Sequence, residues 1–152
     1  MRKLVALLAA VAVAGLAGAT ISLGARQTTV WTAALSTGQE VPAQAVRVTA
    51  AHGLFKATLT GTTLKWTLTY AKLSGPATAA HIHMAAKGKA GAIVVPLCPA
   101  PSPCGTKTTD TVTGSSTISS ALMDAFKKHD LYVNVHTAKN PAGEIRGQLA
   151  RG

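Results

Sequence analysis

The fold of this chain is indicated most directly by residues 54–70, which read LFKATLTGTTLKWTLTY. Successive side chains of a β-strand point to opposite faces, so apolar residues at every second position mark a strand with one buried face. Such alternation occurs on both sides of a central pair, in Phe55, Ala57 and Leu59 and again in Leu64, Trp66, Leu68 and Tyr70. The stretch therefore predicts two antiparallel strands joined by a tight turn at Gly61-Thr62.

Similar short runs occur along most of the chain. Strands are predicted for residues 28–35, 45–49 (a short edge strand), 80–83, 92–97, 107–113, 131–137 and 144–149. Turns are predicted at residues 38–42, 74–76, 88–91 and 140–143, where glycine, proline and asparagine gather. We therefore expect an all-β domain, a sandwich or barrel of seven to nine strands.

One segment has the pattern of a helix instead. Between Ser119 and His129, apolar residues recur at the i, i+3, i+4 spacing of one helical face, and Ser119 or Ser120 is a suitable N-cap. Lys127 and Lys128 fall in the last turn, where the helix dipole favours positive charge. A single short helix near residues 119–128 is therefore expected.

The N-terminus has the pattern of an export signal. Residues 1–3 are basic, residues 4–23 carry no charge, and small residues follow at 17–19 and near Ala25. This arrangement predicts a secretory signal peptide within residues 1–25. An uncleaved membrane anchor is the alternative, because about twenty apolar residues can span a bilayer. Both interpretations place the rest of the chain outside the cytoplasm, secreted or in the cell envelope.

The remaining 127 residues are enough for one domain, and their net charge is about +8. Their lysines and arginines are scattered, without a basic run or an aromatic stacking platform, so we do not expect nucleic acid as a partner. An extracytoplasmic protein or an anionic glycan is the expected kind of partner. A membrane is expected only if the N-terminal segment is retained.

The only two cysteines, Cys98 and Cys104, bracket a proline-rich loop. In an exported chain the expectation is one disulfide that closes this loop. Metal ligation by the two thiols is the alternative, although five intervening residues do not match the usual spacing of zinc-binding cysteine pairs.

Three of the five histidines lie in two predicted strands. His81 and His83 share one face of the first strand, and His136 shares a face of the second with Tyr132 and Asn134. If these strands are neighbours with aligned faces, the three imidazoles converge on a site for copper or zinc, both of which imidazole suits. Supporting residues around the ligands are expected in Tyr132, Asn134, Glu144 and Arg146, with Met84 as a further soft ligand.

A purely structural interpretation of the same residues stays open. The histidines, Asn134, Glu144 and Arg146 then form a hydrogen-bonded network on the outer face of the sheet, with Arg146 paired to a carboxylate or a carbonyl across it. His52 and His129 fall outside the pattern and are expected to face solvent or to pack.

The motifs together resemble one family. Residues 80–83 (AHIH), 132–137 (YVNVHT) and 140–149 (NPAGEIRGQL), with Glu40-Val41-Pro42, are similar to the CHRD domain, the module named after chordin, over residues 29–150. The resemblance implies an immunoglobulin-like or Greek-key β-barrel of secreted proteins, without a settled biochemical activity. The growth-factor binding of chordin is not implied, because this chain lacks chordin's cysteine-rich modules.

Three functions are therefore compatible with the sequence: a binding or structural module, a metal-binding module, and a copper-dependent redox protein. The last rests on the His-x-His strand, which resembles the copper strand of Cu,Zn superoxide dismutases, although a fourth histidine and a zinc loop are not evident. No paired carboxylates, nucleophile elbow or phosphate loop is present, so no residue is assigned as catalytic and a non-enzymatic role is favoured.

Overall fold

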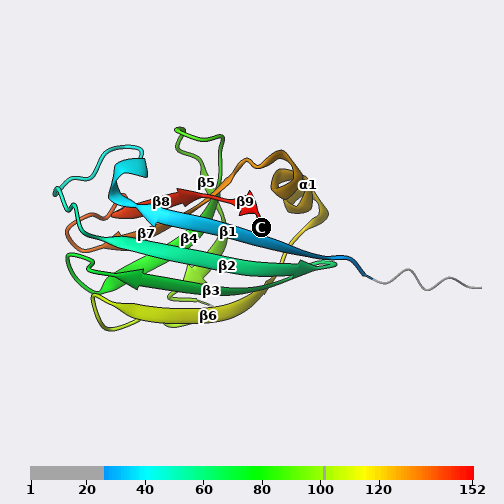
Figure 1. The fold of residues 1–152 in the computed structure, drawn as a ribbon, viewed down its shortest axis with the longest axis horizontal. Coiled ribbons are helices and arrows are strands. Elements are labelled where there is room, and N and C mark those ends of the chain that lie inside the picture. The colour runs from blue at the N-terminus through cyan, green and yellow to red at the C-terminus, as the bar shows by residue number, and fades with distance from the viewer. Residues whose placement is uncertain (1–25, 101) are drawn as a thin grey trace, which may run out of the picture.

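The computed structural model describes residues 26–100 and 102–152, so the predicted signal peptide lies outside the described residues. Its strands are β1 Thr28–Ser36, β2 His52–Thr60, β3 Thr63–Ala71, β4 Ala77–Met84, β5 Ala92–Cys98, β6 Asp110–Thr117, β7 Leu131–Thr137, β8 Ile145–Gln148 and β9 Ala150–Arg151. A 3₁₀ helix, Thr37–Gln39, and the helix α1, Ser120–Lys128, complete the fold (Figure 1).

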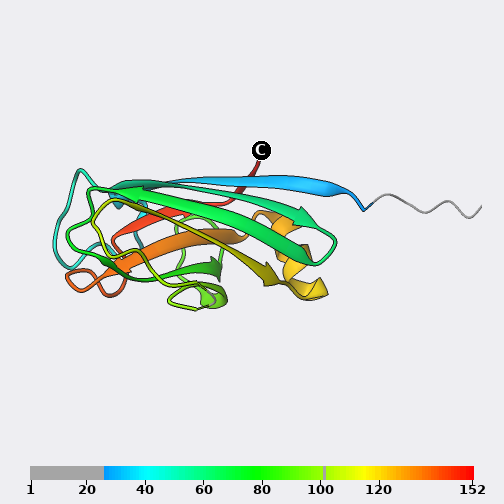
Figure 2. The same cartoon turned by 90° about the horizontal axis from the view of Figure 1, so that it is seen from below.

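The strands form one antiparallel sheet in the order β5-β4-β7-β8-β1-β2-β3-β6, and β9 also pairs with β1. The sheet curves so that β4, β5 and β7 lie beneath β1, β2 and β3 (Figure 2). Among the described residues, β5 and β6 are the two edge strands of the sheet and do not pair with each other. The curved sheet therefore forms a barrel that is nearly closed, with one opening between these strands. The predicted all-β class, with one short α-helix in the described part of the chain, is confirmed.

The hairpin of residues 54–70 has the predicted register. Thr60 pairs with Thr63, Leu59 with Leu64 and Ala57 with Trp66, which leaves Gly61-Thr62 as the two-residue turn. Gly61 has a positive φ of 57°, a conformation that glycine adopts without steric cost. The apolar positions of both strands are buried, as the alternation predicted.

The core lies inside the curve of the sheet. It combines aromatic side chains of the β2–β3 half, where the rings of Phe55 and Trp66 stack with centroids 6.5 Å apart, with aliphatic side chains of the other half, including Ile82, Val133 and Ile145. Because β4, β7 and β8 give these residues to the core, their alternate residues face away from it. That outward face carries the histidines.

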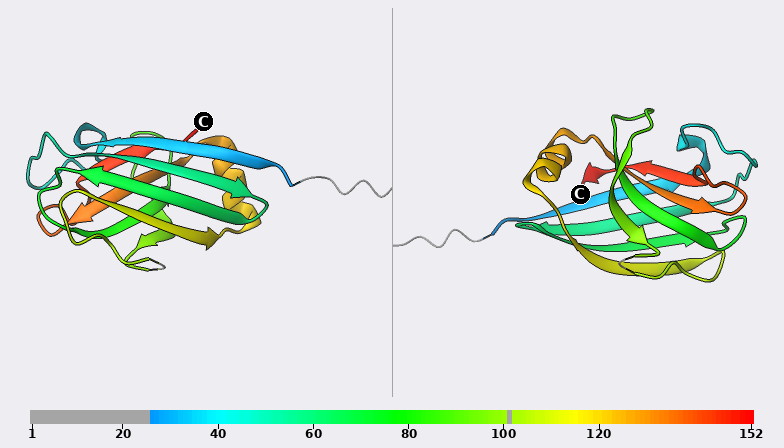
Figure 3. Two further views of the ribbon diagram at one scale, coloured as in Figure 1. Left: turned by 60° about the horizontal axis from the view of Figure 1, so that its bottom comes forward. Right: turned by 180° about the vertical axis from the view of Figure 1, so that it is seen from behind.

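Two loops cover this outward face. The segment between β1 and β2 and the segment between β4 and β5 both rise beside β7 and β8 (Figure 3, right). The predicted edge strand at residues 45–49 lies in the first loop and was wrong, since these residues form bends without a strand partner. Instead, the amide of Val46 donates to Asn140 Oδ1 at 2.8 Å and Gln44 donates to the Glu144 carbonyl at 2.7 Å, which ties the loop to the turn after β7.

Helix α1 connects β6 to β7 at one end of the barrel. Its predicted N-cap is Ser119, whose hydroxyl accepts from the amide of Leu122 at 3.2 Å, and Leu122, Ala125 and Phe126 face the core. Among the described residues, no helix is long and apolar enough to span a bilayer.

Candidate metal centre

The pairing of β4 with β7 brings the three motif histidines together. His81 lies opposite Asn134 and His83 opposite Tyr132, while His136 lies opposite Ala79, so all three project from one face. Each histidine offers one ring nitrogen to a group whose members all lie within 4.8 Å of one another. The predicted convergence of the imidazoles is therefore present in the structure.

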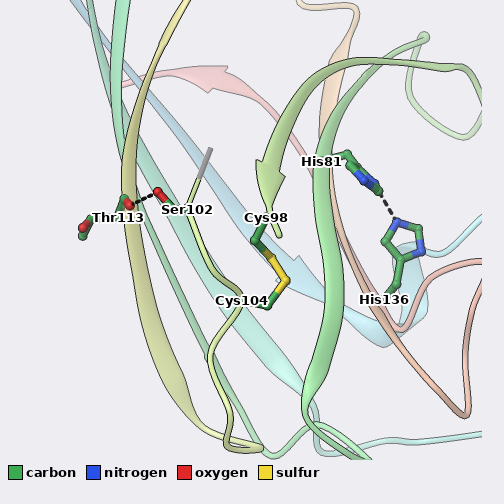
Figure 4. Close-up of a disulfide and its surroundings, with 6 residues drawn as sticks. All are labelled: His81, Cys98, Ser102, Cys104, Thr113 and His136. Atoms are coloured by element: carbon green, nitrogen blue, oxygen red, sulfur yellow. Dashed lines mark hydrogen bonds between the residues drawn. A yellow bond between two sulfur atoms is a disulfide. The ribbon is translucent and has the colours of Figure 1, made fainter. Parts of the chain in front are cut away.

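His81 and His136 are joined directly. His81 Nδ1 lies 3.1 Å from His136 Nε2 (Figure 4). His136 Nδ1 lies 2.9 Å from the carbonyl oxygen of Pro141. A carbonyl only accepts hydrogen bonds, so His136 Nδ1 carries the proton and its Nε2 presents a lone pair. The imidazole of His136 is thus fixed in the tautomer that ligates through Nε2.

His83 is oriented in the same way by a different loop. Its Nδ1 lies 3.0 Å from the carbonyl oxygen of Gly91, which leaves Nε2 as the lone-pair atom. That Nε2 is buried and has no hydrogen-bond partner. Since buried polar atoms are nearly always paired, this nitrogen marks a position that a ligand would satisfy.

The three imidazoles are held neutral. Burial, with the neighbouring His136 and His83, lowers the pKa of His81 to about 4. Burial also lowers the pKa values of His83 and His136, against the effect of their carbonyl partners. Neutral imidazole is the form that binds metals, so the cluster is ready to ligate at neutral pH.

Tyr132 and Arg146 support His83 from behind. The Tyr132 ring stacks on the His83 ring at a centroid distance of 4.8 Å, and the Arg146 guanidinium lies 3.4 Å from the centroid of Tyr132. Arg146 Nη2 donates to the carbonyl of Lys89 at 2.7 Å, so its partner lies in the β4–β5 loop, whereas the structural interpretation expected a carboxylate or a carbonyl across the sheet. The amide of Gly91 donates to the Tyr132 hydroxyl at 3.2 Å. The β4–β5 loop is thus tied to the same face.

Asn134 has a partner that the sequence reasoning missed. Its Nδ2 donates to both carboxyl oxygens of Glu40, each at 2.9 Å, and both residues are buried. Burial raises the pKa of Glu40 to about 8, which outweighs the lowering effects of the Arg146 charge and of the Asn134 hydrogen bond. The only sequence signal was an acid, one of five in the chain, within the Glu40-Val41-Pro42 motif.

Glu144 is fully buried, and its side chain holds the turn after β7. Its carboxylate accepts hydrogen bonds from the amide and hydroxyl of Ser74, from the Thr137 hydroxyl at 2.6 Å and from Asn140 Nδ2 at 3.0 Å. Burial would raise the pKa of Glu144, but these hydrogen bonds outweigh it and lower the pKa. Because this turn also carries Pro141, Glu144 positions the carbonyl that orients His136.

Three residues lie apart from the cluster. Met84 alternates with His83 and borders a hollow beside Val94 and Leu122 on the other side of the strand, so it is not placed to ligate with the histidines. His52 and His129 are exposed. His129 packs on Trp31 with ring centroids 5.6 Å apart, as expected for a residue outside the site.

The predicted disulfide between Cys98 and Cys104 is present (Figure 4). Cys98 ends β5 opposite Ala80, the residue before His81, and is fully buried. The bridge therefore ties the end of β5 to the loop that leads to β6, close to the histidine strand.

Fold and site define a small β-barrel module with a histidine-bearing polar face. Residues 31–149 match the CHRD domain, and the chain belongs to that family. No curated protein and no solved structure matches the chain at the significance required.

Proposed function

We propose that this CHRD domain works outside the cytoplasm and binds a divalent transition metal through His81, His83 and His136. One observation carries the proposal: backbone carbonyls hold Nδ1 of His83 and His136, while Nε2 of His83 is buried without a partner. Carbonyl partners of this type are the usual means by which proteins orient metal-binding histidines. An unpaired buried nitrogen of this kind, facing two further imidazoles, is a position that a metal ion would satisfy.

Copper and zinc are the metals that this ligand set suits. Three neutral imidazoles bind both, and the general affinity order favours Cu(II). The group contains no further His, Cys, Asp or Glu among the described residues, so one coordination position is left for water or an external ligand. Tyr132, Asn134, Glu144 and Arg146 would hold the ligands in place through the contacts described above.

The open position also supports a second candidate, a copper-dependent redox function. His81 and His136 are partly exposed, so a small molecule can approach the metal position from solvent. Metal sites with three protein ligands and one open position are typical of catalysis, whereas structural sites are closed. A superoxide assay on the copper-loaded protein tests this candidate.

Export is supported by three observations. The N-terminal pattern is that of a signal peptide, the domain contains a disulfide, and the CHRD family is typically extracellular. We infer an extracytoplasmic location, where an anionic glycan or another exported protein is a suitable partner for the basic surface.

Calorimetric titration of Cu(II) and Zn(II) into tag-free protein tests metal binding. We expect His81→Ala and His136→Ala to abolish binding, because each removes one of three ligands. His52→Ala and His129→Ala are the matched controls and should bind as the wild type does. Thermal melts show whether each variant is folded.

The proposal would be overturned by either of two results. One is a wild-type protein that binds neither metal below millimolar concentration. The other is a folded triple variant, with alanine at positions 81, 83 and 136, that binds as tightly as the wild type. In both cases the histidines would be a hydrogen-bonded network of a binding module.

A further inference from the structure

A cavity of about 470 Å³ lies at the end of the barrel where β1 begins. It is bordered by β1, the β2–β3 turn, α1 and β9, which meet at this end (Figure 1). The 3₁₀ helix and Glu40 follow the other end of β1, which is eight residue steps or about 27 Å away. The cavity is therefore a site separate from the histidine cluster.

The floor of this cavity is apolar. It consists of Trp31, Leu59 and Phe126, which are less than a tenth exposed, with Met123 beside them. The rings of Trp31 and Phe126 meet edge to face with centroids 5.0 Å apart, and the Trp31 indole N–H donates to Thr29 Oγ1 at 3.0 Å. Because the indole N–H already has its partner, the floor favours an apolar group.

The rim of the cavity is cationic. Arg26, Lys127 and Arg151 line it and are exposed, and no Asp or Glu is among its lining residues. Lys127 is paired with Asp124 at 2.9 Å, whereas neither arginine forms a salt bridge among the described residues. Arg26 also packs against the turn, since a Cβ built on Gly61 would lie 3.3 Å from its Cδ. Within the part of the chain that the structure describes, two arginines without an acidic partner therefore lie above an apolar floor, where they can bind an anion.

We propose that this cavity binds a single-chain anionic amphiphile of the long-chain carboxylate class. The apolar chain lies on Trp31, Leu59 and Phe126, and the carboxylate is held by Arg26 and Arg151, to which it is complementary in charge. The volume lies within the range of about 300–1,000 Å³ found for small-molecule sites.

Fluorescence of Trp31 gives a direct readout. The protein is expressed from the full sequence and purified in the form that the cell produces. It is then titrated with dodecanoate and with dibrominated stearate, each below its micellar concentration. The bromine atoms of the second probe quench tryptophan fluorescence on contact. We expect saturable binding, quenching that Trp31→Phe removes, and no comparable binding of dodecyltrimethylammonium, which reverses the charge of the head group.

Charge variants test the rim. The Arg26→Gln and Arg151→Gln double variant should bind dodecanoate about five- to tenfold more weakly, because two exposed charge interactions are lost. Lys128→Gln is the control: Lys128 is an exposed cation of α1 that does not line the cavity, and its removal should leave dodecanoate binding unchanged.

Three results would overturn the proposal. Equal binding of the cationic amphiphile would show an unspecific apolar surface, and unchanged dodecanoate affinity in the double variant would remove the head-group site. Binding to vesicles rich in anionic lipid, without binding of monomeric dodecanoate, would show a membrane-contact surface instead. None of these measurements involves the metal. Amphiphile binding and metal binding are therefore tested independently of each other.

Discussion

At the scale of residues, the outward face of β4, β7 and β8 combines half-buried and buried imidazoles with one buried carboxyl group. The imidazoles are neutral because burial lowers their pKa values, and the Glu40 carboxyl stays protonated because burial raises its pKa to about 8. Both shifts have the same cause, since a low-dielectric environment disfavours the charged form of a base and of an acid alike. The site is therefore polar but almost free of charge, apart from the Arg146 guanidinium and the Glu144 carboxylate.

Glu40 should make the stability of the domain depend on pH. The unfolded chain releases this proton near 4.5, whereas the folded protein holds it up to about 8, because burial and the nearby Glu144 charge outweigh the opposite effects of the Arg146 charge and the Asn134 amide. Unfolding releases a proton between these values, so the free energy of unfolding falls as pH rises through this window, by an amount on the order of a few kcal/mol. Chemical denaturation between pH 6.5 and 8 measures the slope, to which the three imidazoles with lowered pKa values contribute with the opposite sign.

The Glu40→Gln variant is the control for this effect. Glutamine keeps an oxygen that accepts from Asn134 but does not titrate, so the slope between pH 6.5 and 8 should flatten. An equal slope in both proteins would show that Glu40 is ionised in the folded state throughout this range.

At the scale of elements, short-range interactions determine where the strands and the helix begin and end. Gly61 closes the β2–β3 hairpin, Ser119 begins α1 and the Cys98–Cys104 bridge ends β5. Each of these three features involves residues that are close in the sequence. Sequence patterns could therefore predict all three.

The N-cap of α1 gives a prediction with a matched control. Ser119→Ala removes the acceptor of the Leu122 amide and should lower the free energy of unfolding by about 1 kcal/mol. Ser120→Ala, one residue further, changes an exposed helical position and should have little effect. Urea denaturation of the two variants measures the difference, and equal stabilities would refute the assignment of the cap.

The disulfide should stabilise the domain modestly. Closing a loop across six residues of separation removes limited entropy from the unfolded chain, so replacing both cysteines with alanine should cost about 2 kcal/mol. Alkylation of the exported wild type without reductant should find no free thiol. Labelling of both cysteines, or equal stability of the double variant, would contradict this prediction.

At the scale of the whole molecule, one continuous sheet joins the two proposed sites. The histidine face lies on β4 and β7 and is covered by loops from β1–β2 and β4–β5, whereas the amphiphile cavity lies at the end formed by α1 and the β2–β3 turn. A metal that binds only the folded cluster must stabilise the entire barrel, because the histidines come from two strands that pair only in the fold.

Thermal unfolding tests this coupling. With free Cu(II) at about one hundred times its dissociation constant, the free energy of unfolding should rise by about 2.7 kcal/mol, which corresponds to an increase in Tm of several degrees. The triple alanine variant at positions 81, 83 and 136 should show no increase. An equal shift in both proteins would place the metal elsewhere on the chain.

The sequence by itself determined the all-β class, the hairpin at Gly61-Thr62, the helix near residues 119–128, the disulfide and the shared face of the histidines. These features depend on alternation, caps and loop closure, which act over a few residues. Only the tertiary structure decided that Glu40 meets Asn134, that the carbonyls of Gly91 and Pro141 orient the imidazoles, and that residues 45–49 form a covering loop rather than a strand. These contacts depend on how loops fold over the sheet, and local patterning carries no information about partners as distant as residues 40 and 134.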